Sequence, residues 1–306
     1  MKKVDYYILT QILIDDIHFS DGSCQPDILG GGAYTAAGMR IWSEHVGICS
    51  GIGPDFAEKY DSWFLENDIH VAGVLRDMPC THSRLNYFAD GEREEILMDG
   101  YGSHDLMQPM ISEIPALYDQ CKGMYLFKDC DEKFWTDAIK YLETRSMISV
   151  WEILGAAAVP ENRDAISDYL QHVDLFSLNL TEGRRLSNKE QAIEVMRYVL
   201  GLGAKAVILR LGSKGSLVSD SKKIFHIPAA PGTVVDVTGG GNASTGGFLV
   251  GYCESGGDIV NAGICASVAA SYVLQQFGLP LRIDDVMMHE AVKLARQMQA
   301  ELVDVM

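Results

Sequence analysis

Short apolar runs alternate with longer amphipathic segments along this chain of 306 residues. Short apolar runs are typical of buried strands, and apolar positions spaced three and four apart are typical of helices that cover a sheet. The pattern predicts strands over residues 6–14, 46–51, 70–75, 123–127, 147–151, 175–178, 206–211 and 216–219. It predicts helices over residues 33–42, 55–66, 132–144, 162–172, 189–200, 242–254, 258–277 and 284–303. Because strands and helices alternate, we expect an α/β fold with a mainly parallel sheet.

One segment, residues 81–97, breaks this alternation and reads as two strands joined at Asp90-Gly91. Asp-Gly between alternating apolar and polar positions favours a tight hairpin. The alternation puts Leu85, Tyr87 and Ala89 on one face, and Arg84, Asn86 and Phe88 on the other. An antiparallel hairpin has to lie outside a parallel sheet, so two interpretations stay open. The hairpin either forms a small lid over a ligand cleft or decorates one edge of the domain.

Charge and cysteine usage narrow the class of partner. The formal net charge of −17 argues against a nucleic-acid partner, which would require basic patches, but backbone N–H groups could still bind a phosphorylated ligand. No run of 18 apolar residues and no secretion signal is visible, so we expect a cytoplasmic protein without a membrane span. The seven cysteines form no CxxC pair and are expected to be reduced, and no Cys/His cluster has zinc-site spacing.

The strongest candidate for chemistry is Asp236-Val237-Thr238-Gly239-Gly240-Gly241-Asn242, which precedes a predicted helix. Consecutive glycines can adopt positive φ and let a ligand approach the backbone closely. N–H groups at the start of a helix bind anions such as phosphate, and the helix dipole strengthens the attraction. A flexible turn in which Asn242 merely caps the helix remains an alternative, since Asn is a preferred N-cap residue. No G-x-x-x-x-G-K-[ST] motif is present, so a P-loop is excluded.

The glycine turn, followed by Gly246-Gly247-Phe248, resembles the C-terminal signature of the ribokinase-like (PfkB) carbohydrate kinases, roughly D-T-x-G-A-G-D. Four further segments resemble motifs of that family in the same order along the chain: Gly30-Gly31-Gly32-Ala33, Gly51-Ile52-Gly53-Pro54-Asp55, Asn179-Leu180-Thr181-Glu182 and Leu211-Gly212-Ser213-Lys214-Gly215. The hairpin also matches the place of the family's lid. The resemblance implies a single ribokinase-like domain over residues 1–306, a three-layer α/β/α sandwich. Its β-lid would be formed mainly by residues 77–100 and by part of 12–30.

The resemblance also implies a role for each matching residue. Gly239, Gly240 and Gly241 would form the anion hole for the γ-phosphate of ATP. Asn179 and Glu182 would organise Mg²⁺ through water near the phosphates, although on their own they would read as a solvated loop pair. The nucleotide would further contact Arg210, Gly212, Gly215 and Thr238. Asp15, with Gly31 and Gly32 beside it, would bind substrate hydroxyls at the end of the first strand, and Asp16 is the adjacent alternative.

Three positions depart from the family pattern. Asn242 stands where the family has the aspartate that takes the proton from the attacking hydroxyl, and an amide cannot accept that proton. Ala36 replaces an asparagine that follows the N-terminal glycines, and Val150-Trp151-Glu152 replaces the usual D-P-N, with Glu152 as a substitute acid. The sequence therefore supports two functions. One is an ATP-dependent kinase for a sugar-like or nucleoside-like hydroxyl, and the other is a catalytically impaired relative that binds nucleotide or sugar. A homodimer formed through the lid is plausible by the same resemblance.

Overall fold

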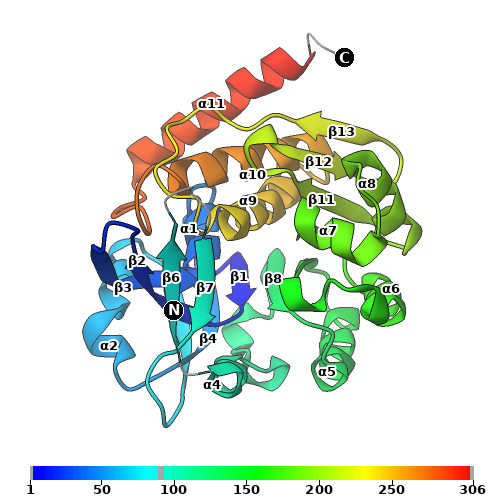
Figure 1. Ribbon diagram of the computed structural model, residues 1–306. Helices are drawn as coiled ribbons and strands as arrows, with labels where there is room; N and C mark the ends of the chain where they lie inside the picture. Colours follow the sequence, from blue (N-terminus) through cyan, green and yellow to red (C-terminus); the bar gives the residue numbers. More distant parts are fainter. Residues whose placement is uncertain (1–2, 89–92, 99, 304–306) are drawn as a thin grey trace.

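Two sheets organise the structure, a computed structural model that describes residues 3–88, 93–98 and 100–303 (Figure 1). The large sheet has nine strands in the order β13-β12-β11-β10-β9-β8-β1-β4-β5. Their bounds are β1 Tyr6–Leu9, β4 Val46–Ile52, β5 His70–Leu75, β8 Gly123–Lys128, β9 Ile148–Ile153, β10 Leu175–Asn179, β11 Ala206–Arg210, β12 Ser216–Ser219 and β13 Ile224–Ile227. Neighbouring strands within the part β11-β10-β9-β8-β1-β4-β5 pair in parallel. Strands β12 and β13 add two antiparallel pairs at the other edge.

Helices cover both faces of the large sheet. They are α1 Gly32–Arg40, α2 Phe56–Lys59, α3 Asp61–Glu66, α4 Gly100–Met107, α5 Glu132–Glu143, α6 Arg163–Leu170, α7 Leu180–Ser187, α8 Ala192–Gly201, α9 Gly240–Glu254, α10 Ile259–Val273 and α11 Asp285–Val303. None of those in the described part of the chain is long and apolar enough to cross a membrane.

The side chains of β1 alternate between two separate cores, one on each face of the large sheet. Tyr6 and Ile8 of β1 join the core beneath α1, α9 and α10, while Tyr7 and Leu9 join the core beneath α5, α6 and α8. Successive side chains of a strand point to opposite faces, so a strand buried on both faces reads as a continuous apolar run. The result is the three-layer α/β/α sandwich that the sequence predicted (Figure 1).

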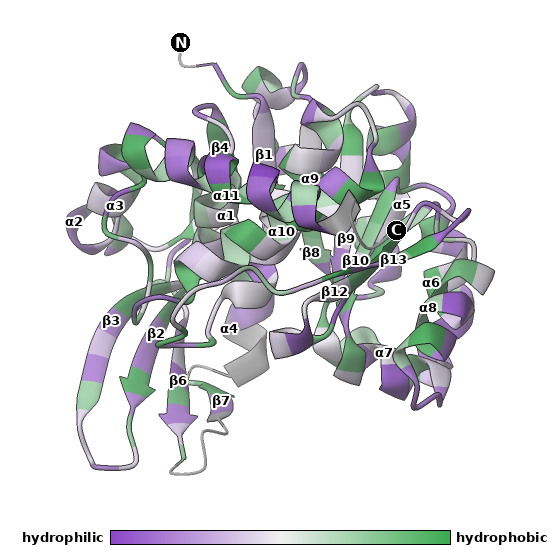
Figure 2. Ribbon diagram, turned by 90° about the horizontal axis from the view of Figure 1, so that it is seen from above, coloured by the Kyte–Doolittle hydropathy of each residue, from purple (hydrophilic) through white to green (hydrophobic). Residues whose placement is uncertain are grey.

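The second sheet is small and projects beside the main body (Figure 2). Its strand order is β3-β2-β6-β7, with β2 Ile12–His18, β3 Cys24–Gly31, β6 His82–Tyr87 and β7 Arg93–Leu97. Strands β6 and β7 form the expected antiparallel pair, and β6 also pairs in parallel with β2. The predicted joint at Asp90-Gly91 and the residue Ala89 lie outside the described residues.

The structure corrects several predicted boundaries. The strand expected over residues 6–14 is two strands in different sheets, because the chain leaves β1 at Thr10 and enters β2 at Ile12. Both pieces begin with apolar residues, and the polar pair Thr10-Gln11 lies between them at the break. The helix expected over 55–66 is likewise divided at Tyr60 into α2 and α3. Strands β3 and β13 and helices α4 and α7 were not predicted.

Candidate active site

The glycine turn opens α9 without a side-chain cap. Gly239 is the N-cap residue, with a left-handed φ of 75°, and in the described part of the chain this position has no side-chain cap hydrogen bond. A Cβ added at Gly239 would lie 2.1 Å from the ring of Tyr34 in α1, so glycine is required both by conformation and by space. Uncapped N–H groups at a helix start attract anions. Asn242 lies in the first turn of α9 and is not its N-cap, which corrects the alternative considered for that residue.

A second glycine-led helix start adjoins the first. Gly31, with a φ of 55°, is the N-cap residue of α1, and Gly32 is the first residue of that helix. Helices α1 and α9 pack closely, since a Cβ added at Gly38 would lie 2.2 Å from the carbonyl oxygen of Ala243. The two predicted glycine sites, separated by about two thirds of the sequence, are therefore brought together by this helix pair.

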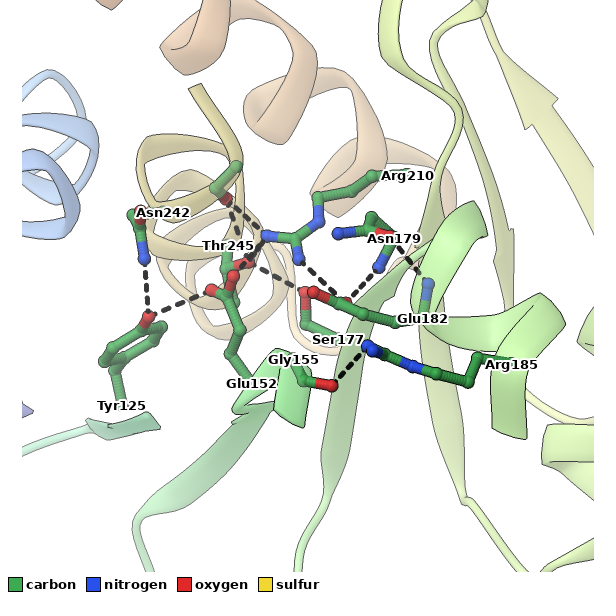
Figure 3. A network of polar contacts seen from close by, with 11 residues as sticks. Tyr125, Glu152, Gly155, Ser177, Asn179, Glu182, Arg185, Arg210, Asn242 and Thr245 are labelled. Carbon is green, nitrogen blue, oxygen red and sulfur yellow. Dashed lines mark hydrogen bonds and ion pairs between the residues drawn. The ribbon is translucent and has the colours of Figure 1, made fainter. Parts of the chain in front are cut away.

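Asn242 is the first member of a network of polar contacts that runs beneath the glycine turn (Figure 3). Its side-chain Nδ2 donates to the hydroxyl of Tyr125 at 3.3 Å, and that hydroxyl donates to Oε2 of Glu152 at 2.9 Å. Tyr125 lies on β8 and Glu152 on β9, and both are buried. Burial raises the pKa of Tyr125 well above its usual value, and the neighbouring Glu152 carboxylate raises it further. Tyr125 therefore remains a neutral donor.

Arg210, at the end of β11, carries the positive charge of the network. Its Nη1 forms an ion pair with Glu152 at 2.5 Å and donates to the Gly241 carbonyl at 2.8 Å and to the Thr245 hydroxyl at 3.0 Å. Burial alone would lower the pKa of Arg210, but the charges of Glu152 and then Glu182 raise it above its usual value. Arg210 is thus a fixed cation that also anchors the first turn of α9.

Asn179 and Glu182 satisfy one another at the start of α7. The Asn179 side chain accepts from the Glu182 N–H at 2.9 Å, and Oε2 of Glu182 accepts from the Asn179 N–H at 2.7 Å. This reciprocal pair is a capping box. Burial raises the pKa of Glu182, whereas Arg210, with its Nη2 at 3.8 Å, opposes that rise.

The capping box limits how Asn179 and Glu182 could bind a magnesium ion. Among the described residues there is no group of three or more His, Cys, Asp or Glu side chains that could hold a metal. The Oδ1 atom of Asn179 is already used by the helix. Mg²⁺ bound through phosphate oxygens and water needs few protein ligands, and a single partly shielded carboxylate such as Glu182 fits that mode. These residues do not fit a site in which protein side chains alone surround the ion.

The structure moves Asp15 away from its expected place. Instead of ending the first strand, Asp15 lies within β2 of the small sheet, where it accepts a hydrogen bond from Ser83 of β6 at 2.5 Å. It is buried, and a Cβ added at the facing Gly30 would lie 2.1 Å from its carboxylate. Asp16, the adjacent alternative, accepts instead from the backbone of Asp27 at 3.0 Å.

Two further predicted glycines shape the edge of the large sheet beyond Arg210. Gly212 and Gly215 have φ values of 62° and 82° and bracket the turn between β11 and β12. A Cβ added at Gly215 would lie 2.0 Å from the carbonyl oxygen of Ile227, so β13 runs directly against this turn.

Sequence reasoning missed three residues that join the site. Tyr125 lies in an apolar strand, and Thr245 lies among small residues between Asn242 and Gly246, where the motif itself assigns it no role. Tyr87 was placed on the same face of the hairpin as Leu85 but was given no role, and its hydroxyl hydrogen-bonds both the Asp236 carboxylate and the Thr238 hydroxyl. The small sheet is thereby fastened to the segment that leads into the glycine turn.

Comparison with known proteins agrees with this arrangement. The model of the pfkB family carbohydrate kinases matches residues 11–284, which is most of the chain. The chain belongs to the PfkB family of carbohydrate kinases. Among curated relatives, an aminoimidazole riboside kinase of Salmonella typhimurium is 37% identical, with 72% of each chain covered. A cytidine kinase of Thermococcus kodakarensis is 25% identical, with 81% of this chain and 88% of the relative covered.

Solved structures of two kinases share the fold at low sequence identity. The adenosine kinase of Sinorhizobium meliloti has a TM-score of 0.79 at 19% identity, covering 96% of this chain and 99% of its own. The Arabidopsis thaliana ribokinase complexed with ribose and ATP has a TM-score of 0.75 at 20% identity, covering 97% and 99%. The ribokinase-like fold predicted from the motifs is thus confirmed.

Proposed function

We propose that this protein is an ATP-dependent kinase that transfers the γ-phosphate of Mg·ATP to a hydroxyl of a sugar-like or nucleoside-like substrate. One observation carries the proposal. The glycine turn, the base position Asn242 and the N-x-x-E carboxylate Glu182 belong to a single network of polar contacts centred on Arg210 and Glu152 (Figure 3). Phosphoryl transfer is catalysed chiefly by positioning and by stabilisation of charge, and such a network supplies both.

Each residue has a role in this proposal. The N–H groups of Gly240 and Gly241 receive the γ-phosphoryl oxygens, and Arg210 fixes the carbonyl of Gly241 so that these donors keep their direction. Glu182 would hold Mg²⁺ through water, and the ion would supply neutralisation of charge on the phosphates. Thr238, Gly212 and Gly215 are assigned to the nucleotide side. Family membership and the names of the relatives support this assignment.

The substrate side is assigned to the junction of the two sheets. Gly31 and Gly32 offer a second helix start next to the first, and Asp15 is a hydroxyl acceptor on the small sheet. The small sheet acts as a lid, since Tyr87 joins it to Asp236 and Thr238 beside the glycine turn. Closure of such a lid excludes water and limits hydrolysis of ATP. Assembly as a homodimer through the lid and a cytoplasmic location stay part of the proposal.

Turnover with a panel of acceptors tests the proposal. The protein and its Asn242→Asp variant are incubated with Mg·ATP and with ribose, fructose, cytidine or adenosine, and ADP release is followed. We expect acceptor-dependent ADP release by the unmodified protein. Mg·ATP should also raise the melting temperature, because a ligand that binds only the native state stabilises it. Absence of both effects at millimolar nucleotide would contradict the kinase proposal.

The second candidate is a catalytically impaired relative that binds nucleotide or sugar, and Asn242 is the observation that favours it. Loss of a general base costs about 10² to 10⁴ in rate. This candidate predicts thermal stabilisation by Mg·ATP without turnover, and a gain of turnover in Asn242→Asp. Fast turnover by the unmodified protein would exclude it.

A further inference from the structure

The hydroxyl of Tyr125 determines which way the Asn242 amide faces. Glu152 is held in a salt bridge by the Arg210 guanidinium at 2.5 Å, and a carboxylate only accepts hydrogen bonds. The single proton of the Tyr125 hydroxyl is committed to Oε2 of Glu152 at 2.9 Å. The Tyr125 oxygen can therefore only accept from Asn242, and the amide nitrogen has to be the atom that faces it, at 3.3 Å.

This order of donors leaves the amide oxygen of Asn242 on the side away from Tyr125. The two ends of a carboxamide are distinguished by their hydrogen-bond partners, so the network decides the rotamer. Asn242 is half-buried in the first turn of α9, next to the glycine N–H groups, whereas Tyr125 is fully buried beneath it (Figure 3). Under the proposed function, the side away from Tyr125 is the one from which a substrate would approach this amide oxygen.

We propose that Tyr125 is a positioning residue that turns the Asn242 amide oxygen toward the substrate hydroxyl, which lets phosphoryl transfer proceed without a carboxylate base. This inference rests on the proposed kinase function. The substrate hydroxyl donates its hydrogen bond to Asn242 Oδ1, and this orientation points a lone pair of the substrate oxygen at the γ-phosphorus. The new oxygen–phosphorus bond forms, the bond from that phosphorus to the ADP oxygen breaks, and the hydroxyl proton passes to a non-bridging oxygen of the transferred phosphoryl group.

A double-mutant cycle tests the orientation directly. In the native background, Tyr125→Phe removes the acceptor that holds the Asn242 amide nitrogen, so the amide can exchange the positions of its oxygen and nitrogen. The kcat should then fall about tenfold, the cost of one hydrogen bond. The KM for the acceptor should change less than kcat. In the Asn242→Asp background both side-chain atoms are acceptors, so orientation no longer matters. There, Tyr125→Phe should change kcat by less than about twofold.

Tyr7→Phe is the matched control, because it also removes a hydroxyl from a fully buried tyrosine of the large sheet. The Tyr7 hydroxyl contacts Tyr141 at 3.1 Å, in the core on the other face. This variant should leave kcat unchanged in both backgrounds. A purely structural role for Tyr125 would instead lower kcat by the same factor with Asn or Asp at position 242, and that result would overturn the inference.

A measurement without turnover separates this inference from the kinase proposal. In protein labelled with ¹⁵N-asparagine, the side-chain amide of Asn242 is identified as the signal that Asn242→Asp lacks. Its chemical shift and its exchange with water should change in Tyr125→Phe and stay the same in Tyr7→Phe. An unchanged signal overturns the orientation even if the enzyme turns over. Failure of all variants to phosphorylate any acceptor, with the signal responding as expected, refutes the kinase function and the catalytic part of this inference together.

Discussion

Replacement of Gly239 by alanine should cost more stability than the same change at Gly201 or Gly212, and these three glycines form a graded series. Gly201 lies in α8 with open space around it and without positive φ, so Gly201→Ala should raise the free energy of unfolding by about 0.5–1 kcal/mol. Gly212 has a φ of 62° and nothing within 4 Å, so alanine there meets only the backbone cost, about 1–2 kcal/mol.

Gly239 adds a collision to that cost. Its φ is 75°, and a new Cβ would lie 2.1 Å from the ring of Tyr34, which is buried between α1 and α9. Overpacking of this kind costs about 1–3 kcal/mol, so Gly239→Ala should lose roughly 2–5 kcal/mol in total. Urea unfolding with an unchanged m-value measures each variant. Equal losses for Gly239→Ala and Gly212→Ala would refute the close approach of α1 and α9 at the turn.

Three further predictions concern charged and polar contacts. Arg210→Met should lower the free energy of unfolding by about 3–5 kcal/mol, because it leaves Glu152 buried and unpaired, and replacement of both residues by Met should recover most of that loss in urea titrations. Tyr87→Phe should speed amide hydrogen exchange in β6, since the small sheet loses its hydrogen bonds to the glycine-turn segment. Unchanged exchange would show that the Tyr87 contacts with Asp236 and Thr238 do not stabilise the small sheet. The Arg76 guanidinium lowers the pKa of Glu113 in the folded state, so this pair stabilises the protein above pH 4.5 and loses its contribution as pH falls below that value. Acid titration of stability should show the loss, and Arg76→Met should abolish it.

Local patterns predicted the scaffold and the glycine turns, because both depend on neighbouring residues. Apolar runs gave most strands of the large sheet, and positive φ at Gly239 and Gly31 follows from their place before helices. The route of the chain between the two sheets was not predictable. The polar pair Thr10-Gln11 interrupts the apolar run, but it does not reveal that the chain passes there from one sheet to the other.

The surroundings of Asn242 escaped prediction for another reason. Tyr125, Glu152 and Arg210 come from three different strands and meet only because those strands are neighbours or near neighbours in the sheet. The sequence marked Glu152 as a substitute acid and Arg210 as a nucleotide contact, whereas Tyr125 looks like an ordinary strand residue. The substitution at position 242 was visible in the sequence, whereas the hydrogen-bond order that decides its orientation depends on all three partners at once.

The early departure of the chain from the large sheet has a mechanical consequence. The outward crossing at Gln11 and the return crossing at Gly32 are tied together, since the Gly32 N–H donates to the Gln11 carbonyl at 2.9 Å. Because β2 and β3 leave and rejoin the main body at this one bonded crossing, the crossing helps to set the angle between the two sheets. Gly31 and Gly32, the glycines assigned to the substrate, form part of that crossing. The fit of a substrate and the angle of the small sheet would then depend on each other, so a poorly fitting molecule would keep the small sheet from closing over the site.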